Sequence, residues 1–249
     1  MRSDATVMEI DREWADACEV QRGFMPHSLP ETQAFSYSAR CRQLRELGGD
    51  CYDFVPLPDN RVAVTVGDAS GKGLAAALMI SNVQSSLRTA ASFSQNDNAT
   101  VLGAVNRQVH SSALSDRYAT LFYGVFEGST RTLRYVNAGH NPPMVMHRDG
   151  SVDWLETGGA PVGIFSDWTY EEETVQLDSG DWLIAYTDGV TEAMNPAGEQ
   201  WGVDGLRRAA ARSAAQSADD VVHSIFTSMD EFSRGCQHDD ATVVVMRVH

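Results

Sequence analysis

The heptapeptide GDASGKG at residues 67–73 combines one carboxylate with three glycines and a lysine. An apolar run at 61–66 precedes it and predicts a buried strand, and the alanine-rich segment after it predicts a helix. Asp68 is therefore expected at a strand end, in a turn whose glycines accept backbone angles that other residues avoid. Taken alone, the motif also fits a structural turn in which Asp68 caps the helix.

Other acidic residues occupy similar places in the chain. Asp50 opens a predicted strand, Asp188 follows an apolar strand, and Asp239 and Asp240 directly precede the last one. Two stacked sheets would bring these strand ends into one cleft, where carboxylates repel one another and a divalent cation relieves the repulsion. Carboxylates without a histidine ligand form a hard oxygen site suited to Mg²⁺ or Mn²⁺. For any single acid, a turn or cap role is the alternative.

A nucleotide-binding P-loop is excluded by spacing. That motif needs four residues between its first glycine and the Gly-Lys pair, and then a serine or threonine. Here three residues intervene, and Gly73 follows Lys72.

Composition narrows the class of partner. The chain has 249 residues, 43% of them hydrophobic, and a net charge of -15, which allows one large domain with a strongly acidic surface. Nucleic acid and anionic membranes bind basic patches, so we expect neither as a partner of this acidic chain. The same charge disfavours a metal-dependent nuclease. No stretch approaches the ~20 apolar residues of a membrane span. The cysteines are scattered without a CxxC pair, and we expect reduced thiols in a cytoplasmic protein.

Hydrophobic periodicity and turn residues divide the chain into the elements of a single domain. Helices are expected at 4–25, 74–89, 100–110 with Thr100 as cap, 203–213, and 218–232 with Ser217 as cap. Strands are expected at 35–42, 50–55, 61–66, 118–126, 132–137, 143–147, 151–155, 168–177, 181–187 and 241–248. A hairpin connection at 56–60 would place Asp50 and Asp68 at the same end of a sheet.

The helix expected at 4–25 is amphipathic. Its apolar positions, mostly three and four residues apart, are Val7, Ile10, Trp14, Ala17, Val20 and Phe24. Packing of this stripe on its own domain is the simpler interpretation, and self-association is the alternative.

Six ordered motifs resemble those of the bacterial PPM, or PP2C-like, serine/threonine phosphatases of the SpoIIE and RsbU type. They are GGDCYDF at 48–54, GDASGKG at 67–73, YATLFYG at 118–124, NAGHNPP at 137–143, YTDGVTE at 186–192 and DDAT at 239–242. The stretch VQRGFMPHSLP at 20–30 resembles the family's lead-in to the domain. Cys51 replaces the family's usual aromatic residue and Ala69 its usual valine, and neither change removes a side-chain ligand.

The resemblance implies an α+β fold, a four-layer αββα sandwich with two central antiparallel β-sheets flanked by helices. It divides the chain into an N-terminal amphipathic helix at 1–25, a candidate dimerisation or regulatory segment, and a phosphatase domain at 26–249.

The resemblance also implies a dinuclear centre with two Mn²⁺ or Mg²⁺ ions. The ligands carried over by position are Asp50, Asp68, Ala69 through its backbone carbonyl, Asp188 and Asp239. Asp68 is expected to bridge both ions. Asp240 is expected to lie next to the ligands without binding an ion itself. Two adjacent divalent ions lower the pKa of a shared water and aim it at phosphorus, so no serine, cysteine or histidine nucleophile is needed.

The implied activity is that of a metal-dependent protein serine/threonine phosphatase. Its implied substrate is a phosphorylated STAS-domain anti-sigma-factor antagonist in a partner-switching pathway of signal transduction or stress response. An upstream regulator, and a second copy bound through the N-terminal helix, are the other implied partners. The alternative is a catalytically inactive module that binds phosphorylated STAS domains, but a pure binder has no need of a repulsive acidic cleft.

Two further residues keep two interpretations each. His140 could protonate the leaving oxygen of the substrate, or it could order its turn through hydrogen bonds. Lys72 could reach the substrate phosphate, or it could cover the start of its helix as solvated scaffold.

Overall fold

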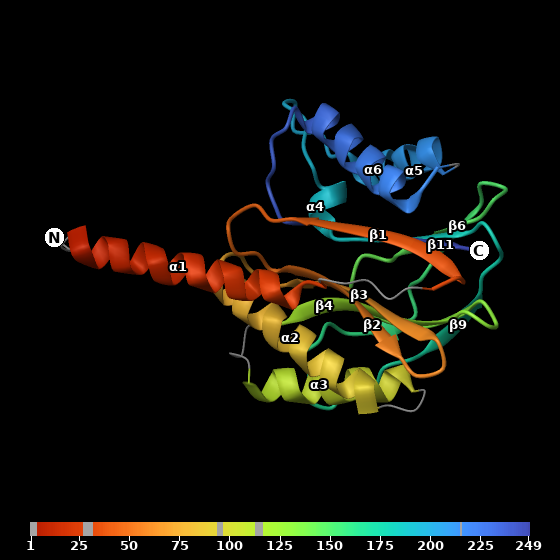
Figure 1. Cartoon of the computed structure of the whole chain (residues 1–249), viewed down its shortest axis with the longest axis horizontal. Helices are drawn as coiled ribbons and strands as arrows, with labels where there is room; N and C mark the ends of the chain where they lie inside the picture. The colour runs from red at the N-terminus through yellow and green to blue at the C-terminus, as the bar shows by residue number, and fades with distance from the viewer. Residues whose placement is uncertain (1–3, 27–31, 94–96, 113–116, 215) are drawn as a thin grey trace.

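The computed structural model shows two β-sheets packed face to face, with helices on both outer sides (Figure 1). It describes residues 4–26, 32–93, 97–112, 117–214 and 216–249, and the side chains from Ile10 onwards. Part of the lead-in motif at 20–30 lies outside the described residues. The expected four-layer α+β sandwich is confirmed.

The elements follow the expected order closely. The helices are α1 (Asp4–Phe24), α2 (Leu74–Phe93), α3 (Asn98–Ser112), α4 (Asp188–Thr191), α5 (Gly202–Ser213) and α6 (Ala218–Ser233). The strands are β1 (Phe35–Arg42), β2 (Asp50–Leu57), β3 (Arg61–Ala69), β4 (Ala119–Glu127), β5 (Thr132–Ala138), β6 (Met144–Met146), β7 (Val152–Trp154), β8 (Gly158–Gly159), β9 (Glu173–Gln176), β10 (Trp182–Tyr186) and β11 (Ala241–Val248).

The strands form two sheets. Sheet A has the order β1-β11-β10-β6-β7, and sheet B has the order β2-β3-β4-β5-β8 with β9 also paired to β5. The expectation of purely antiparallel sheets is corrected at one edge, where the two-residue strand β8 runs parallel to β5. Glycine allows this close approach, because a Cβ on Gly158 would lie 2.0 Å from the carbonyl oxygen of Asn137.

Three apolar layers hold the sandwich together. Alternate residues of β3 face opposite sides, with Val62, Val64 and Val66 in the core between the sheets and Ala63 in the core under α2 and α3. Strand β11 divides its side chains in the same way between the inter-sheet core and the core under α5 and α6. Such strands are buried on both faces, which explains why they are continuous apolar runs in the sequence.

Three local expectations are corrected. Helix α3 begins at Asn98, and Asp97 rather than Thr100 acts as its cap, since Asp97 Oδ1 accepts from the backbone N–H of Thr100 at 3.1 Å. The strand expected at 168–177 is confined to β9, and residues 168–172 have no regular secondary structure. Helix α4 was not expected, since four residues are too few to show a helical period. The Ser217 cap of α6 is confirmed as a reciprocal capping box with Asp220.

Helix α1 packs on the domain with part of the expected apolar stripe, since Trp14 and Ala17 lie against the small core formed by Cys18, Leu47 and Ala77. Ile10 and Val20, from the expected apolar stripe, are 40% and 64% exposed. Cys18 packs against the loop before β2 and against α2, and Gln21 is buried beside it. The Gln21 amide donates to the carbonyl of Gly48 at 2.7 Å and accepts from the N–H of Gly48 at 3.2 Å. In Figure 1 the start of α1 projects beyond the sandwich.

Across the described residues, no helix is long and apolar enough to cross a bilayer. All four cysteines are free, and burial raises the thiol pKa of Cys41 and of Cys51.

An ion pair joins β2 to α2, and a neighbouring hydrogen bond joins α2 to the end of α1. The carboxylate of Asp53 is buried, and Arg88 donates to both of its oxygens, with Nη2 at 2.8 Å from Oδ1. The neighbouring Gln84 donates to the carbonyl of Phe24 at 2.9 Å. Asp53, although part of the GGDCYDF motif, therefore serves the packing of α2 on sheet B.

We expect the Arg88→Met variant to lose about 2 kcal/mol of unfolding free energy, because it leaves the Asp53 carboxylate buried without its partner. Urea unfolding would measure the change. Adding Asp53→Asn should restore part of the loss, and Arg208→Met on the exposed face of α5 is the matched control. Equal stability of Arg88→Met and wild type would contradict this account of the pair.

Candidate metal centre

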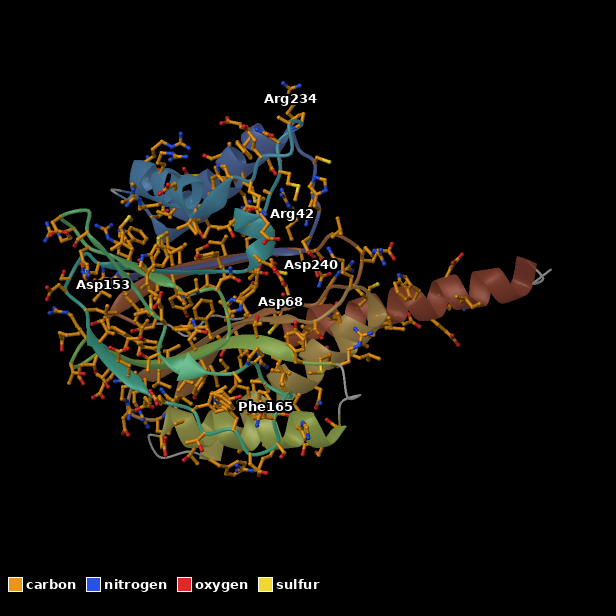
Figure 2. All side chains as sticks on the ribbon, turned by 180° about the vertical axis from the view of Figure 1, so that it is seen from behind. Arg42, Asp68, Asp153, Phe165, Arg234 and Asp240 are labelled. Atoms are coloured by element: carbon orange, nitrogen blue, oxygen red, sulfur yellow. The ribbon has the colours of Figure 1, made fainter. Side chains whose placement is uncertain are left out.

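The acidic residues gather at one edge of the sandwich, where strands from both sheets end. In sheet B the antiparallel register places Asp50 of β2 directly opposite Asp68 of β3, which confirms that they share one end of the sheet. In sheet A, Asp188 follows the end of β10, and Asp239 and Asp240 precede the start of the neighbouring β11. Figure 2 shows Asp68 and Asp240 close together between the two sheets.

The electrostatics of Asp68 show that the two sheets bring their acids within range of one another. Burial, followed by the charges of Asp188, Asp239 and Asp240, raises the pKa of Asp68 to about 8. Burial and then the charge of Asp239 also raise the pKa of Asp188. Asp68, Asp188 and Asp239, three of the predicted ligands, are thus neighbours although they belong to different sheets.

Asp50 lies deeper than the other acids. Its side chain is buried, and the hydroxyls of Thr187 and Thr242 each donate to Oδ2 at 2.7 Å. Burial, followed by the charge of Asp68, raises the pKa of Asp50 well above its ordinary value. The carboxylate therefore clamps sheet B to sheet A, and its Oδ1 is the oxygen left for any ligand role.

Asp240 holds the turn before β2. Its Oδ1 accepts from the N–H of Leu44 and its Oδ2 from the N–H of Gly49, both at 2.7 Å. Both oxygens are engaged by the backbone, which fits the expectation that Asp240 supports the ligands.

Asp239 is paired with a lysine. The ammonium of Lys72 lies 2.5 Å from Asp239 Oδ2 and donates to the carbonyl of His238 at 3.1 Å. The N–H of Asp240 donates to the other oxygen of Asp239 at 2.9 Å. Lys72 is thus more than solvated scaffold, because it offsets the charge of one acid in the cluster.

The two glycines of the GGD motif keep space open around the acids. Neither has a positive φ, so backbone flexibility is not the reason for glycine at these positions. A Cβ on Gly48 would lie 2.5 Å from Asp240 Oδ2, and one on Gly49 would lie 3.1 Å from the carbonyl oxygen of Ala69. The space beside the Ala69 carbonyl and the Asp68 carboxylate exists because no side chain fills it.

His140 orders the chain after β5. The backbone N–H of His140 donates to Asn137 Oδ1 at 2.7 Å, and the ring Nδ1 lies 2.8 Å from the hydroxyl of Thr120. Burial lowers its pKa to about 4, so the ring is neutral near neutral pH. These contacts favour the structural interpretation over that of a proton donor.

The donor set fits a divalent cation. Among the described residues no three His, Cys, Asp or Glu side chains are already gathered as a metal-binding group. Nevertheless, Asp68, Asp188 and Asp239 offer only hard oxygen donors, and one lysine cannot offset their combined charge.

The residues that position these acids were not predicted from the sequence. Thr187 and Thr242 form the clamp on Asp50, and Arg117 donates to the carbonyl of Ser70 at 3.0 Å beside the GDASGKG turn. Both threonines lie inside the YTDG and DDAT motifs, close to an acid, which was the available signal.

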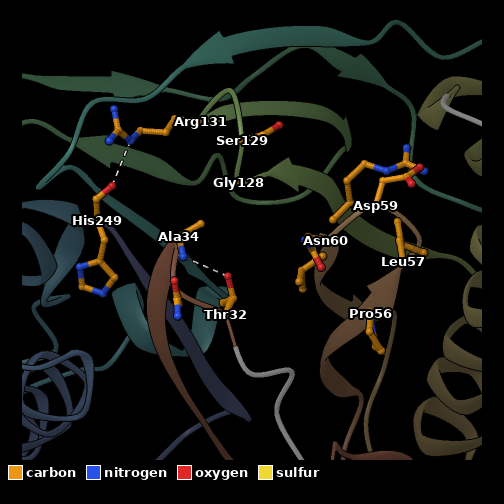
Figure 3. A pocket seen from close by; sticks show the side chains of 13 residues that line it. Thr32, Ala34, Pro56, Leu57, Asp59, Asn60, Gly128, Ser129, Arg131 and His249 are labelled. Atoms are coloured by element: carbon orange, nitrogen blue, oxygen red, sulfur yellow. Dashed lines mark hydrogen bonds between the residues drawn. The ribbon is translucent and has the colours of Figure 1, made fainter.

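A cavity of about 980 Å³ lies at the opposite end of β2 from the acids (Figure 3). Turns at 56–62 and 128–131 line it together with His249, whose carbonyl accepts from Arg131 Nε at 3.0 Å. None of the predicted ligands lines this cavity, so its size does not make it the site of metal chemistry.

Comparison with known proteins agrees with this arrangement. The family model for stage II sporulation protein E (SpoIIE) matches residues 58–249. The chain is 30% identical over 210 residues to protein IcfG of Synechocystis, covering 74% of this chain and 33% of IcfG. It is 27% identical over 240 residues to phosphoserine phosphatase RsbU of Bacillus subtilis, covering 96% of this chain and 71% of RsbU. The chain thus spans a third of one relative and about seven tenths of the other.

The fold is also that of a solved structure, the SiaA-PP2C domain of Pseudomonas aeruginosa. The two superpose with a TM-score of 0.83 at 22% identity, over 100% of both chains. The family model covers most of the sequence, and the fold agrees with it. The chain therefore belongs to the SpoIIE family of PP2C-type phosphatases.

Proposed function

We propose that this chain is a metal-dependent protein serine/threonine phosphatase that hydrolyses phosphoserine or phosphothreonine on a partner protein in the cytoplasm. The observation that carries the proposal is the convergence of Asp68 from sheet B with Asp188 and Asp239 from sheet A. A cluster of like charges at one edge lowers the free energy of unfolding, and a bound divalent cation would relieve the repulsion between the carboxylates. The catalytically inactive binding module remains the less economical alternative, because it has no use for these carboxylates.

Two Mn²⁺ or Mg²⁺ ions would be held by the residues expected from the sequence, namely Asp50, Asp68, the Ala69 carbonyl, Asp188 and Asp239. Bound divalent ions supply an activated water and neutralise the charge of a phosphate group. The chain's own part is to position the ligands. Asp68 lies between the acids of both sheets, the two threonines fix Asp50, and Gly49 leaves the Ala69 carbonyl accessible.

The proposed substrate is a phosphorylated STAS-domain anti-sigma-factor antagonist in a partner-switching pathway. The motif resemblance supports this class of substrate, and the similarity to a protein named phosphoserine phosphatase supports the phosphorylated residue. We further propose that α1 forms a homodimer or binds an upstream regulator, because Ile10 and Val20 are exposed apolar side chains on it and its start projects from the sandwich.

Substitution of the central acid tests the activity. We expect wild type to release phosphate from an aryl phosphate and a phosphoserine peptide with Mn²⁺ and not with chelator. Asp68→Asn should lower turnover by at least ~100-fold, because metal ligands contribute several kcal/mol to catalysis. Asp204→Asn, at an exposed position of α5, is the matched control. Absence of both turnover and a Mn²⁺-induced thermal shift in wild type would favour the binding module.

Relief of repulsion tests the convergence of the acids. In chelator, Asp188→Asn should melt about 2 to 4 °C above wild type, the shift that ~1 kcal/mol produces in a chain of this size. The same variant should gain less stability from added Mn²⁺, because it binds the ion more weakly. Differential scanning fluorimetry would measure both effects, again with Asp204→Asn as control. A lower melting temperature in chelator would argue against repulsion at Asp188.

Substitutions in α1 test the proposed homodimer. We expect wild type to be dimeric by multi-angle light scattering, and Ile10→Asp combined with Val20→Asp to be monomeric, because the charges oppose burial of that face. Val203→Asp, at an exposed apolar position of α5, should remain dimeric. A wild-type protein that is monomeric at every concentration measured would remove the homodimer proposal.

A further inference from the structure

Lys72 is the single lysine of this chain, and it lies in the turn between Asp68 and α2. Its side chain is 47% exposed, yet its ammonium lies 2.5 Å from Asp239 Oδ2 and 3.1 Å from the carbonyl oxygen of His238. Two hydrogen bonds therefore tie the turn after β3 to the segment before β11. This connection joins the acid of sheet B to an acid of sheet A.

Each carboxylate oxygen of Asp239 accepts one hydrogen bond. Lys72 engages Oδ2, and the N–H of Asp240 engages Oδ1 at 2.9 Å. The N–H donor belongs to the backbone of the next residue and is held in place by it. The lysine is the partner that can leave, because its flexible stem can move the ammonium without moving the backbone.

The charge of Lys72 acts on the whole cluster. Burial and the neighbouring acids raise the pKa of Asp68 and of Asp188, and Lys72 lowers both. Other cations lie near the turn, but Arg117 donates to the carbonyl of Ser70. In the portion of the chain that the structure describes, Lys72 is the cation that forms an ion pair with an acid of this cluster.

We infer that Lys72 is a built-in counter-cation that competes with divalent metal for Asp239. A divalent ion bound at Oδ2 would repel the ammonium 2.5 Å from that oxygen, so Lys72 lowers the affinity of the site and is displaced when the ion binds. The inference rests on the proposed metal-dependent function. A half-exposed ion pair is weak and screened by salt, so the competition is modest and reversible.

The first test is metal affinity without turnover. Isothermal titration with Mn²⁺ should show Lys72→Met binding about two- to five-fold more tightly than wild type, the range that such an ion pair supplies. Lys72→Arg, which keeps the charge, should stay close to wild type. Arg45→Met removes a cation beside the same turn that has no bond to Asp239, and should change the affinity less than Lys72→Met does. The difference between Lys72→Met and wild type should shrink at high salt.

The second test exploits the single lysine. Reductive methylation followed by mass spectrometry reports on Lys72 alone, apart from the α-amino group. We expect Lys72 to be methylated faster with Mg²⁺ than with chelator, and Asp239→Asn to be methylated fast in chelator. An unchanged rate at a Mg²⁺ concentration that shifts the melting temperature would overturn the inference while leaving the metal site intact.

Two other outcomes are decisive. Equal or weaker Mn²⁺ binding by folded Lys72→Met would show that the lysine does not compete with the ion. If wild type binds neither Mn²⁺ nor Mg²⁺ by titration or thermal shift, the proposed metal site itself fails, and this inference fails with it.

Discussion

Repulsion between carboxylates is the constraint on which the rest of this structure depends. Asp68, Asp188 and Asp239 come from separate strand ends, and burial with their mutual charge raises the pKa of Asp68 to about 8. Left alone, such residues would separate into solvent. They stay together because Asp68 belongs to the central ladder of sheet B, and the other two flank the β10–β11 pair at the centre of sheet A. The sandwich thus supplies the rigidity that holds like charges in place.

The acids divide into two groups by what holds them. Asp50 and Asp240 accept hydrogen bonds from hydroxyl and backbone donors on other elements, and so use their charge to build the edge. Hydrogen bonds to a carboxylate are stronger than those between neutral groups, which suits a contact that must resist repulsion nearby. Asp68 and Asp188 have fewer such partners, and burial together with neighbouring acids raises the pKa of both.

Most of the architecture could be predicted from the sequence because its central strands have simple patterns. Residues 241–248 were predicted as a strand and form β11, since both faces of that strand are buried. The shared location of Asp50 and Asp68 followed from one short hairpin. The apolar stripe predicted on α1 was right only in part. Trp14 and Ala17 pack on the domain, whereas Val20 is exposed, because hydrophobic periodicity gives no weight to the two hydrogen bonds between Gln21 and Gly48.

The site could be predicted only in part, for a related reason. Acids at strand ends are visible in the sequence, whereas the partner of each acid depends on tertiary contacts. Thr187 and Thr242 are 137 and 192 residues away from the Asp50 that they bind, and Lys72 is 167 residues away from Asp239. At such separations the local sequence pattern cannot show whether an acid binds a metal ion or joins the two sheets through hydrogen bonds. The space beside Gly48 is equally invisible, because it depends on where Asp240 of another sheet lies.

These long-range contacts also connect α1 to the acids. Gln21 holds Gly48 through both its N–H and its carbonyl, and the next residue, Gly49, donates to Asp240. Gly48 lies so close to Asp240 that there is no room for a side chain between them. A displacement of α1 must therefore either break the two bonds at Gly48 or carry the turn with it. If the turn moves with α1, the hydrogen bond from Gly49 to Asp240 changes. A movement of the projecting helix is therefore transmitted to the edge of the sandwich where the acids meet.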